Sequence, residues 1–202
     1  MFVCDREDLE YDWVKGEIPT EVQNMWKQSW AWGRWLGIVV MVMVVGWFSL
    51  QSADAMLGNP APEITNATWI NSAPLRMADL RGNVVMVEFW TFGCYNCRNV
   101  EPYVKHWYQQ YKDQGFVVIG VHSPEFAHER EVENVKRYMK EHEIRFPVPI
   151  DNEFSTWNRY GNRYWPAMYL IDKRGIIRSV NIGEGGYSEM ERQIQTLLAE
   201  PG

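Results

Sequence analysis

Apolar and polar positions follow two different periods along residues 63–202. Short apolar runs bounded by turn-forming residues predict strands, and apolar residues spaced three or four apart predict helices with one buried face. The predicted strands are 69–70, 84–90, 116–121, 148–151, 167–171 and 176–181. The predicted helices are 77–80, 94–114, 130–143, 154–160 and 188–199.

This alternation of strands and helices predicts an α/β fold with one core and a mainly parallel central sheet. Only the turn at 172–175, which ends in Gly175, separates the last two strands, so they should form an antiparallel hairpin. The sheet is therefore expected to be mixed, with antiparallel strands at one side. Ser188 and Glu191 predict a capping box at the start of the final helix.

A longer apolar segment at 36–50 is uncharged and has Ser49 as its only polar side chain. It is apolar all round, which disfavours a core helix with one buried face. One interpretation is a short membrane-spanning helix anchored by interfacial Trp residues. The other is a signal-peptide core, because the small-residue pattern Ala-Asp-Ala at 53–55 fits a cleavage site. Both interpretations place the residues after 55 outside the cytoplasm.

These segments divide the chain into four parts. The acidic N-terminal tail contains Cys4, a thiol that would stay reduced in a cytoplasmic tail. Pro60 and Pro62 favour extended chain in a linker before the folded domain. The predicted parts are a tail at 1–34, a transmembrane anchor or signal-peptide core at 35–55, a linker at 56–62 and a folded domain at 63–202.

The charge balance of the chain argues against a nucleic-acid partner. The chain has 26 acidic and 20 basic residues, a net charge of −6, and its folded part contains no block of basic residues. Nucleic-acid binding depends on clustered Lys and Arg side chains that neutralise phosphates. We therefore expect no nucleic-acid partner.

The chemistry-bearing motif is a Cys-x-x-Cys pair, Cys94 and Cys97, between the apolar run 84–90 and a predicted helix. Backbone N–H groups at a helix start stabilise a thiolate, which is the nucleophile of disulfide exchange. A zinc site would need a second ligand pair, but the only other cysteine is Cys4 and the four histidines have no zinc-finger spacing. We expect no metal and no cofactor.

His122 and Glu125 follow the end of the predicted strand 116–121. Sites in α/β proteins gather at the carboxyl ends of such strands. These two side chains are therefore candidates for substrate contact, and packing of the loop is the alternative interpretation.

The strand, Cys-x-x-Cys and helix together resemble the thioredoxin superfamily. Pro102 follows Cys97 by five residues, where the family has a helix-kinking proline. Trp165 and Pro166 precede a late strand, as the family's cis-proline does, and Glu88 stands where the family often has a buried acid. The resemblance implies a thioredoxin-like three-layer sandwich with a central mixed sheet, preceded here by one N-terminal apolar helix.

Within the superfamily, the chain resembles the redoxin or TlpA-like branch, because of the extra helix between its strands and the lead-in around 75–80. The segments 120–126, 160–166 and 183–187 are similar to the exported thioredoxin-like module of DipZ-type membrane proteins. Such proteins carry a multi-span electron-transfer module upstream, which is not found in this sequence. The resemblance therefore implies a membrane electron-donor protein as a separate partner.

The resemblance also implies roles for individual residues. Cys94 is the expected attacking thiol and Cys97 the resolving thiol, while Glu88 relays a proton to Cys97. The residues expected to contact substrate are Trp165, Pro166, Tyr95 and Asn96. The last two, which lie between the cysteines, also tune the redox potential in the family and leave the direction of electron flow open.

The function expected from these residues is thiol–disulfide exchange with exported proteins. A peroxiredoxin-like peroxidase is an alternative because Thr91 and Cys94 match its T-x-x-C pattern, although Val87 stands at the proline position of that pattern. A non-enzymatic copper carrier or binding module that uses the two cysteines is a further alternative. The catalytic domain is expected in the periplasm or at the cell exterior, either anchored to the membrane or released by cleavage near Ala55.

Overall fold

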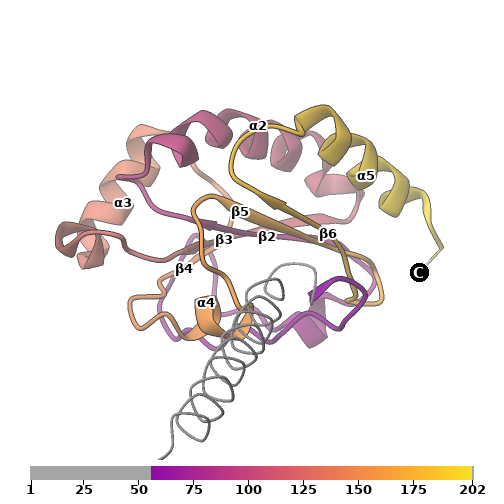
Figure 1. Ribbon diagram of the computed structural model, residues 1–202, viewed down its shortest axis with the longest axis horizontal. Coiled ribbons are helices and arrows are strands. Elements are labelled where there is room, and N and C mark those ends of the chain that lie inside the picture. Colours follow the sequence, from indigo (N-terminus) through magenta and orange to yellow (C-terminus); the bar gives the residue numbers. More distant parts are fainter. Residues whose placement is uncertain (1–55, 202) are drawn as a thin grey trace, which may run out of the picture. The chain divides into compact units, whose positions relative to one another are not determined.

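The computed structural model describes residues 56–201 (Figure 1). The predicted tail at 1–34, with Cys4, and the apolar segment at 35–55 lie outside the described residues. No helix within the described part of the chain is long and apolar enough to cross a membrane. The strands are β1 (Trp69–Ile70), β2 (Val84–Trp90), β3 (Phe116–His122), β4 (Val148–Pro149), β5 (Ala167–Ile171) and β6 (Ile177–Ile182). The α-helices are α2 (Tyr95–Tyr111), α3 (Val132–Glu141), α4 (Ser155–Arg159) and α5 (Tyr187–Ala199), and the 3-10 helices are η2 (Met77–Leu80), η3 (Lys112–Gln114) and η4 (Ala127–Arg130).

The central sheet has the strand order β3-β2-β5-β6. β2 and β3 are parallel, whereas β5 is antiparallel to both β2 and β6. The prediction of a mixed sheet is confirmed, but the prediction of a mainly parallel one is wrong. Only β2 and β3, which the crossover through α2 joins, are parallel. The hairpin of β5 and β6 lies at one side of the sheet as expected, and β5 is antiparallel to its neighbour β2.

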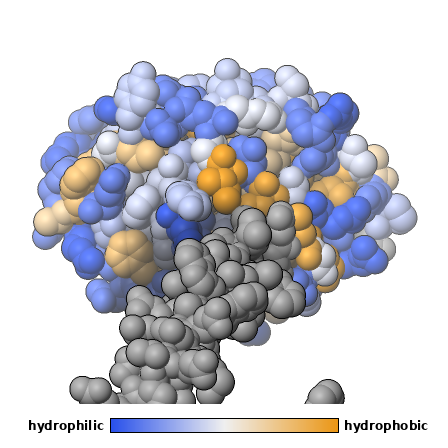
Figure 2. Space-filling model, viewed as in Figure 1, coloured by the Kyte–Doolittle hydropathy of each residue, from blue (hydrophilic) through white to orange (hydrophobic). Residues whose placement is uncertain are grey.

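Helices cover both faces of this sheet, as the three-layer prediction requires (Figure 1). Residues of β2 alternate between the faces because successive strand side chains point in opposite directions. Val84, Met86 and Trp90 belong to a core with α2, α3 and α5, and the intervening residues belong to a second core with α4 and η2. Glu88 stands in the same alternation as the first set, so its carboxyl lies on the α2 face. On the side shown in Figure 2 the described surface is mainly hydrophilic, with isolated hydrophobic residues.

Two short pairings extend the fold beyond the sheet. β1 and β4 form an antiparallel pair, and the backbone of Ile150 forms an isolated parallel bridge with His122 at the end of β3. The predicted linker at 56–62 is held against the start of β6: the Gly58 N–H donates to the Ile177 carbonyl at 2.9 Å, and the Ile177 N–H donates to the Asn59 carbonyl at 3.0 Å. The folded unit therefore begins before residue 63.

The long helices begin in different ways. Cys94 is the N-cap of α2, and Pro102 lies inside that helix as expected. α5 begins after Gly186, which has a positive φ of 67° and provides no side-chain cap. The predicted capping box is wrong, because Ser188 already lies inside the helix and the Glu191 carboxylate instead accepts a hydrogen bond from the Tyr111 hydroxyl at 2.8 Å.

Candidate active site

Cys94 stands at the junction between β2 and α2, where its sulfur faces the first turn of the helix. Its Sγ accepts a hydrogen bond from the Cys97 N–H at 3.2 Å, and its own N–H donates to the Thr91 carbonyl at 3.3 Å. Both thiols are free, and Cys94 is 9% exposed whereas Cys97 is 3% exposed. Both thiols are buried, and Cys94 is the more accessible of the two.

The environments of the two thiols separate their pKa values. The hydrogen bond from the Cys97 thiol, aided by backbone N–H groups of Cys97 and Asn96, lowers the pKa of Cys94 to about 7, although burial and Glu125 oppose this. The same thiol–thiol hydrogen bond, together with burial, raises the pKa of Cys97. At neutral pH a large share of Cys94 is therefore a thiolate while Cys97 keeps its proton.

Glu88 is a buried carboxyl group, only 3% exposed, in the middle of β2. Burial raises its pKa to about 8, and the negative charges of Glu101 and the Cys94 thiolate add to this rise. The charge of Glu88 also raises the pKa of Cys97. Glu88 is thus electrostatically coupled to both thiols, and it can hold or release a proton near neutral pH.

The bond between Trp165 and Pro166 is cis, as expected for this position. The Trp165 indole N–H donates to the Ser123 carbonyl at 3.0 Å, and its ring packs against Trp157 with centroids 4.3 Å apart. Trp165 also packs against the core cluster that contains both cysteines. The Pro166 carbonyl accepts a hydrogen bond from the Gly183 N–H at 2.8 Å. The segment that contains the cis-proline is therefore held by hydrogen bonds to both Ser123 and Gly183.

Tyr95 and Asn96, between the cysteines, are exposed at the start of α2. The Tyr95 side chain is 68% exposed, and the Arg98 guanidinium lies 6.0 Å from its ring centroid. Tyr164, just before the cis-proline edge, is 57% exposed. Exposed aromatic side chains therefore stand on both segments that contain the predicted substrate-contacting residues.

His122 is not exposed to a substrate. Its ring is fully buried, stacks on Phe92 at 5.7 Å and has its Nε2 3.3 Å from the Thr91 hydroxyl oxygen. Burial lowers the pKa of His122 to about 4, so the ring is neutral at physiological pH. Of the two alternatives, loop packing is the one observed for His122, whereas Glu125 is exposed.

The sequence patterns did not identify Glu129, a fully buried carboxylate in η4. It accepts hydrogen bonds from the N–H groups of Gly93 at 2.7 Å, Glu125 at 2.6 Å and Phe126 at 2.8 Å. An acidic residue at the third position of a helix, reaching back to the N-cap N–H, is half of a capping box. The acidic residue was the only part of the capping-box pattern visible in the sequence, because the N-cap here is Phe126 rather than Ser or Thr.

A model of the AhpC/TSA family matches residues 57–180, more than half of the chain. The chain belongs to the AhpC/TSA family. It is similar to Protein DipZ of Mycobacterium tuberculosis, with 44% identity over 148 residues that cover 70% of this chain and 21% of DipZ. It is also similar to Thiol-disulfide oxidoreductase YkuV of Bacillus subtilis, with 29% identity covering 71% of this chain and 97% of YkuV.

Solved structures place this AhpC/TSA domain among thioredoxin-like folds. A thioredoxin-like superfamily protein matches with a TM-score of 0.66 and 29% identity, covering 71% of this chain and 98% of that protein. A thiol-disulfide isomerase from Corynebacterium glutamicum matches with a TM-score of 0.63 and 30% identity, covering 70% and 98%. The predicted thioredoxin-like fold is confirmed.

Within the AhpC/TSA domain, Thr91 is one of the two residues on which the peroxidase alternative rested. Its hydroxyl is fully buried against His122, and Val87, at the proline position of the peroxidase pattern, is a fully buried residue of β2. The alternative that rested on Thr91 and Cys94 therefore gains nothing from the geometry. Within residues 56–201 no group of three or more His, Cys, Asp or Glu side chains is arranged to hold a metal ion.

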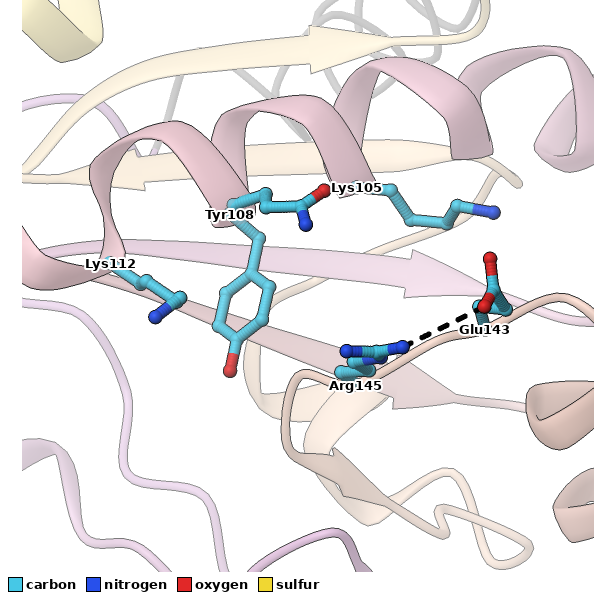
Figure 3. A pocket seen from close by; sticks show the side chains of 6 residues that line it. Lys105, Tyr108, Lys112, Glu143 and Arg145 are labelled. Carbon is cyan, nitrogen blue, oxygen red and sulfur yellow. Dashed lines mark ion pairs between the residues drawn. The ribbon is translucent and has the colours of Figure 1, made fainter.

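A surface pocket of about 340 Å³ lies between α2 and the segment before β4 (Figure 3). Its cationic side chains all have partners within the protein: Arg145 pairs with Glu143 at 3.6 Å, Lys105 donates to the His142 carbonyl at 2.6 Å, and Lys112 pairs with Asp113 at 3.0 Å. The pocket contains no cysteine and contributes nothing to the dithiol site. Its lining residues are Lys105, Tyr108, Gln109, Lys112, Glu143 and Arg145.

Proposed function

We propose that this protein is a thiol–disulfide oxidoreductase that works through the Cys94–Cys97 couple. The observation that carries the proposal is the separation of the two thiol pKa values at the start of α2. Cys94 is partly ionised and nearer the surface, while Cys97 beneath it stays protonated. The names of the similar proteins YkuV and the Corynebacterium isomerase support the same activity.

In the reducing direction, the Cys94 thiolate attacks one sulfur of a substrate disulfide. A Cys94–substrate disulfide forms, and the second substrate sulfur leaves as a thiolate that takes a proton from solvent. Cys97 then gives its proton to the Glu88 carboxylate and attacks the Cys94 sulfur. The first substrate sulfur leaves and takes up that proton. The substrate gains two electrons and two protons, and Cys94 and Cys97 end as a disulfide.

The reducing direction is supported by the pKa of Cys94. A strongly oxidising couple has a nucleophilic cysteine with a pKa near 3.5, because its thiolate is highly stabilised, whereas thioredoxin has a value of about 7. The Cys94 pKa of about 7 matches the second case. The oxidised protein would then need a reductant, for which we propose a membrane electron-donor protein.

We propose that the substrates are disulfides of exported proteins and that the domain acts in the periplasm or at the cell exterior. The apolar segment at 36–50, as an anchor or signal-peptide core, supports this location. We propose that the substrate binds in a groove with Trp165 and Pro166 on one side and Tyr95 and Asn96 on the other. The full activity and partners of DipZ are not carried over, because this chain spans only 21% of it.

The decisive experiment combines trapping with a redox titration of the full chain. Cys97→Ser should accumulate a mixed disulfide between Cys94 and a substrate protein, and Cys94→Ser should accumulate none. The reduction potential should lie near that of thioredoxin, about −270 mV, rather than near −120 mV. Absence of a trapped partner with Cys97→Ser, or peroxide consumption faster than disulfide reduction, would reject the proposal.

The location has a separate test. Mass spectrometry of the protein from membrane and soluble fractions would give its N-terminus. A terminus just after Ala55 indicates cleavage of a signal peptide, and an intact N-terminus in the membrane fraction indicates an anchor. An intact protein found only in the cytosolic fraction would contradict both forms of the localisation proposal.

A further inference from the structure

Glu129 connects the turn directly before Cys94 to the loop that follows β3. One carboxylate oxygen accepts the N–H of Gly93, the residue directly before Cys94, at 2.7 Å. The other oxygen accepts the N–H groups of Glu125 and Phe126, at 2.6 and 2.8 Å, in the loop that follows β3. A single side chain thus joins the turn that positions Cys94 to a loop with an exposed aromatic residue, Phe126.

A buried carboxylate in this position needs a reason to be there. Removing a charge from water is costly unless hydrogen bonds or an opposite charge compensate. Glu129 is fully buried, and none of the ion pairs among residues 56–201 includes it. The neighbouring His122 ring is neutral, since burial lowers its pKa to about 4. The buried Glu129 carboxylate is therefore stabilised by the three backbone N–H groups that donate to it.

The identity of Gly93 is explained by the same contact. A Cβ atom at this position would collide with Oε1 of Glu129 and come within 3.4 Å of the Phe126 ring. Gly93 is not among the glycines with a positive φ, so its backbone conformation does not require glycine. Glycine at this position lets the carboxylate approach the backbone closely, and a larger residue would displace the Glu129 side chain from its hydrogen bonds.

We propose that Glu129 is a positioning residue that holds the Gly93–Cys94 turn in the geometry required for a reactive Cys94. Through the Gly93 N–H it fixes the turn in which the Cys94 sulfur receives its hydrogen bond from the Cys97 N–H. Through Glu125 and Phe126 it links that turn to the loop after β3. This inference rests on the proposed role of Cys94 as the attacking thiol.

The experiment measures iodoacetamide alkylation of Cys94 in the full-length reduced protein between pH 5 and 10, followed by mass spectrometry of the Cys94 peptide. Three variants are compared with the wild type. Glu129→Gln keeps the shape but turns an amide donor toward backbone donors, and Glu129→Asp keeps the charge but is too short to reach both loops. Asp172→Asn, the matched control, removes a different buried carboxylate at the β5–β6 turn.

If Glu129 positions the turn, both of its variants raise the midpoint of the Cys94 profile by about one pH unit, so alkylation at pH 6 slows about tenfold. At pH 10 all rates should converge, and Asp172→Asn should follow the wild-type profile even though it unfolds more easily. A purely electrostatic role predicts a lower midpoint for Glu129→Gln and no shift for Glu129→Asp. Either that result or unchanged profiles in both variants overturns the proposal.

A measurement on the wild type covers the case in which the variants do not fold. The Gly93 amide should exchange with solvent at least a hundredfold more slowly than an unprotected amide, because it donates a 2.7 Å hydrogen bond to the buried Glu129 carboxylate. An unprotected Gly93 amide overturns the proposal. Failure of Cys97→Ser to trap a substrate would instead reject the proposed function, since Gly93 protection does not depend on it.

Discussion

Glu88 and Glu129 are both buried carboxyl groups close to the cysteines, but their environments differ. Glu129 accepts three backbone N–H groups, which occupy both of its carboxylate oxygens. Glu88 lies among apolar neighbours in β2, and burial raises its pKa to about 8. One carboxyl is therefore suited to hold structure and the other to exchange a proton.

The pKa of Glu88 predicts a pH-dependent stability. A carboxyl whose pKa rises on folding, here from 4.5 to about 8, contributes most below pH 4.5, and this contribution is lost as the pH rises toward 8. Its part in the free energy of unfolding should fall by about 1.4 kcal/mol per pH unit across that window. Urea titrations from pH 4 to 9 should show a flatter profile for Glu88→Gln. Parallel profiles for the two proteins would refute the raised pKa.

Glu88 should also control the second chemical step. Only the carboxylate can take the proton of Cys97, so resolution of the mixed disulfide should accelerate as the pH rises through about 8. Glu88→Gln should slow resolution about 100-fold and abolish this pH dependence, because a general base has been removed. Stopped-flow kinetics with a fluorescent disulfide would separate the steps, and the first step should keep its rate. Equal slowing of both steps would indicate a disturbed fold instead.

The elements around the thiols were the most predictable from the sequence. The run Val84–Trp90 and the Cys-x-x-Cys that follows it combine a continuous apolar strand with a helix start, and both appear within a few residues of the expected bounds. Strand order was less predictable, because a sequence shows which segments are strands but not which strand becomes the neighbour of β2. The start of α5 was also predicted incorrectly. The helix begins after Gly186, which has a positive φ, and not with the capping box expected from Ser188 and Glu191.

In the candidate site too, residues close together in the sequence were easier to predict than residues far apart. Cys94, Cys97 and Glu88 are close in sequence and belong to one strand and the helix start that follows it, so local pattern and resemblance were enough to propose them. Glu129 reaches Gly93 across 36 positions of sequence. Its buried carboxylate looks like an ordinary surface charge in the sequence, because its partners are backbone N–H groups that are identical at every non-proline residue.

The β5–β6 hairpin depends on Asp172, which is 2% exposed. Burial opposes its ionisation, but hydrogen bonds from the N–H groups of Ile176 and Arg174 and from the Arg178 guanidinium lower its pKa overall. Asp172→Asn should therefore reduce the free energy of unfolding by about 1–3 kcal/mol at pH 7. A lowered pKa gives stability that is lost as the pH falls, so the difference should shrink in acid. Urea titrations at pH 7 and pH 3 would test this, and an equal difference at both values would contradict it.

At the scale of the whole molecule, the thiol pair lies at the start of α2, in a domain whose central sheet is covered on both faces by helices (Figure 1). The match to nearly the full length of YkuV, 97% of it, indicates that a domain of this size can exist as a separate protein. We therefore expect the described part of the chain to fold and exchange disulfides without residues 1–55.

The start of that domain can be tested by truncation. A fragment of residues 56–202 keeps three backbone hydrogen bonds between the predicted linker and the hairpin: Gly58 to Ile177, Ile177 to Asn59, and Ala61 to Gly175, at 2.9, 3.0 and 2.9 Å. A fragment of residues 63–202 loses all three and exposes one edge of β6. Its free energy of unfolding should be about 1.5–4.5 kcal/mol lower, at about 0.5–1.5 kcal/mol for each hydrogen bond.

Urea unfolding of both fragments, together with their rates of disulfide reduction, measures the contribution of the lead-in segment. The thiol pair lies at the start of α2, whereas the lead-in segment pairs with residues 175–177, so both fragments should reduce a disulfide at similar rates under native conditions. Equal stability of the two fragments would show that 56–62 is a linker after all. Loss of activity in both would show that the domain needs residues 1–55, because the longer fragment keeps every pairing that the described residues make.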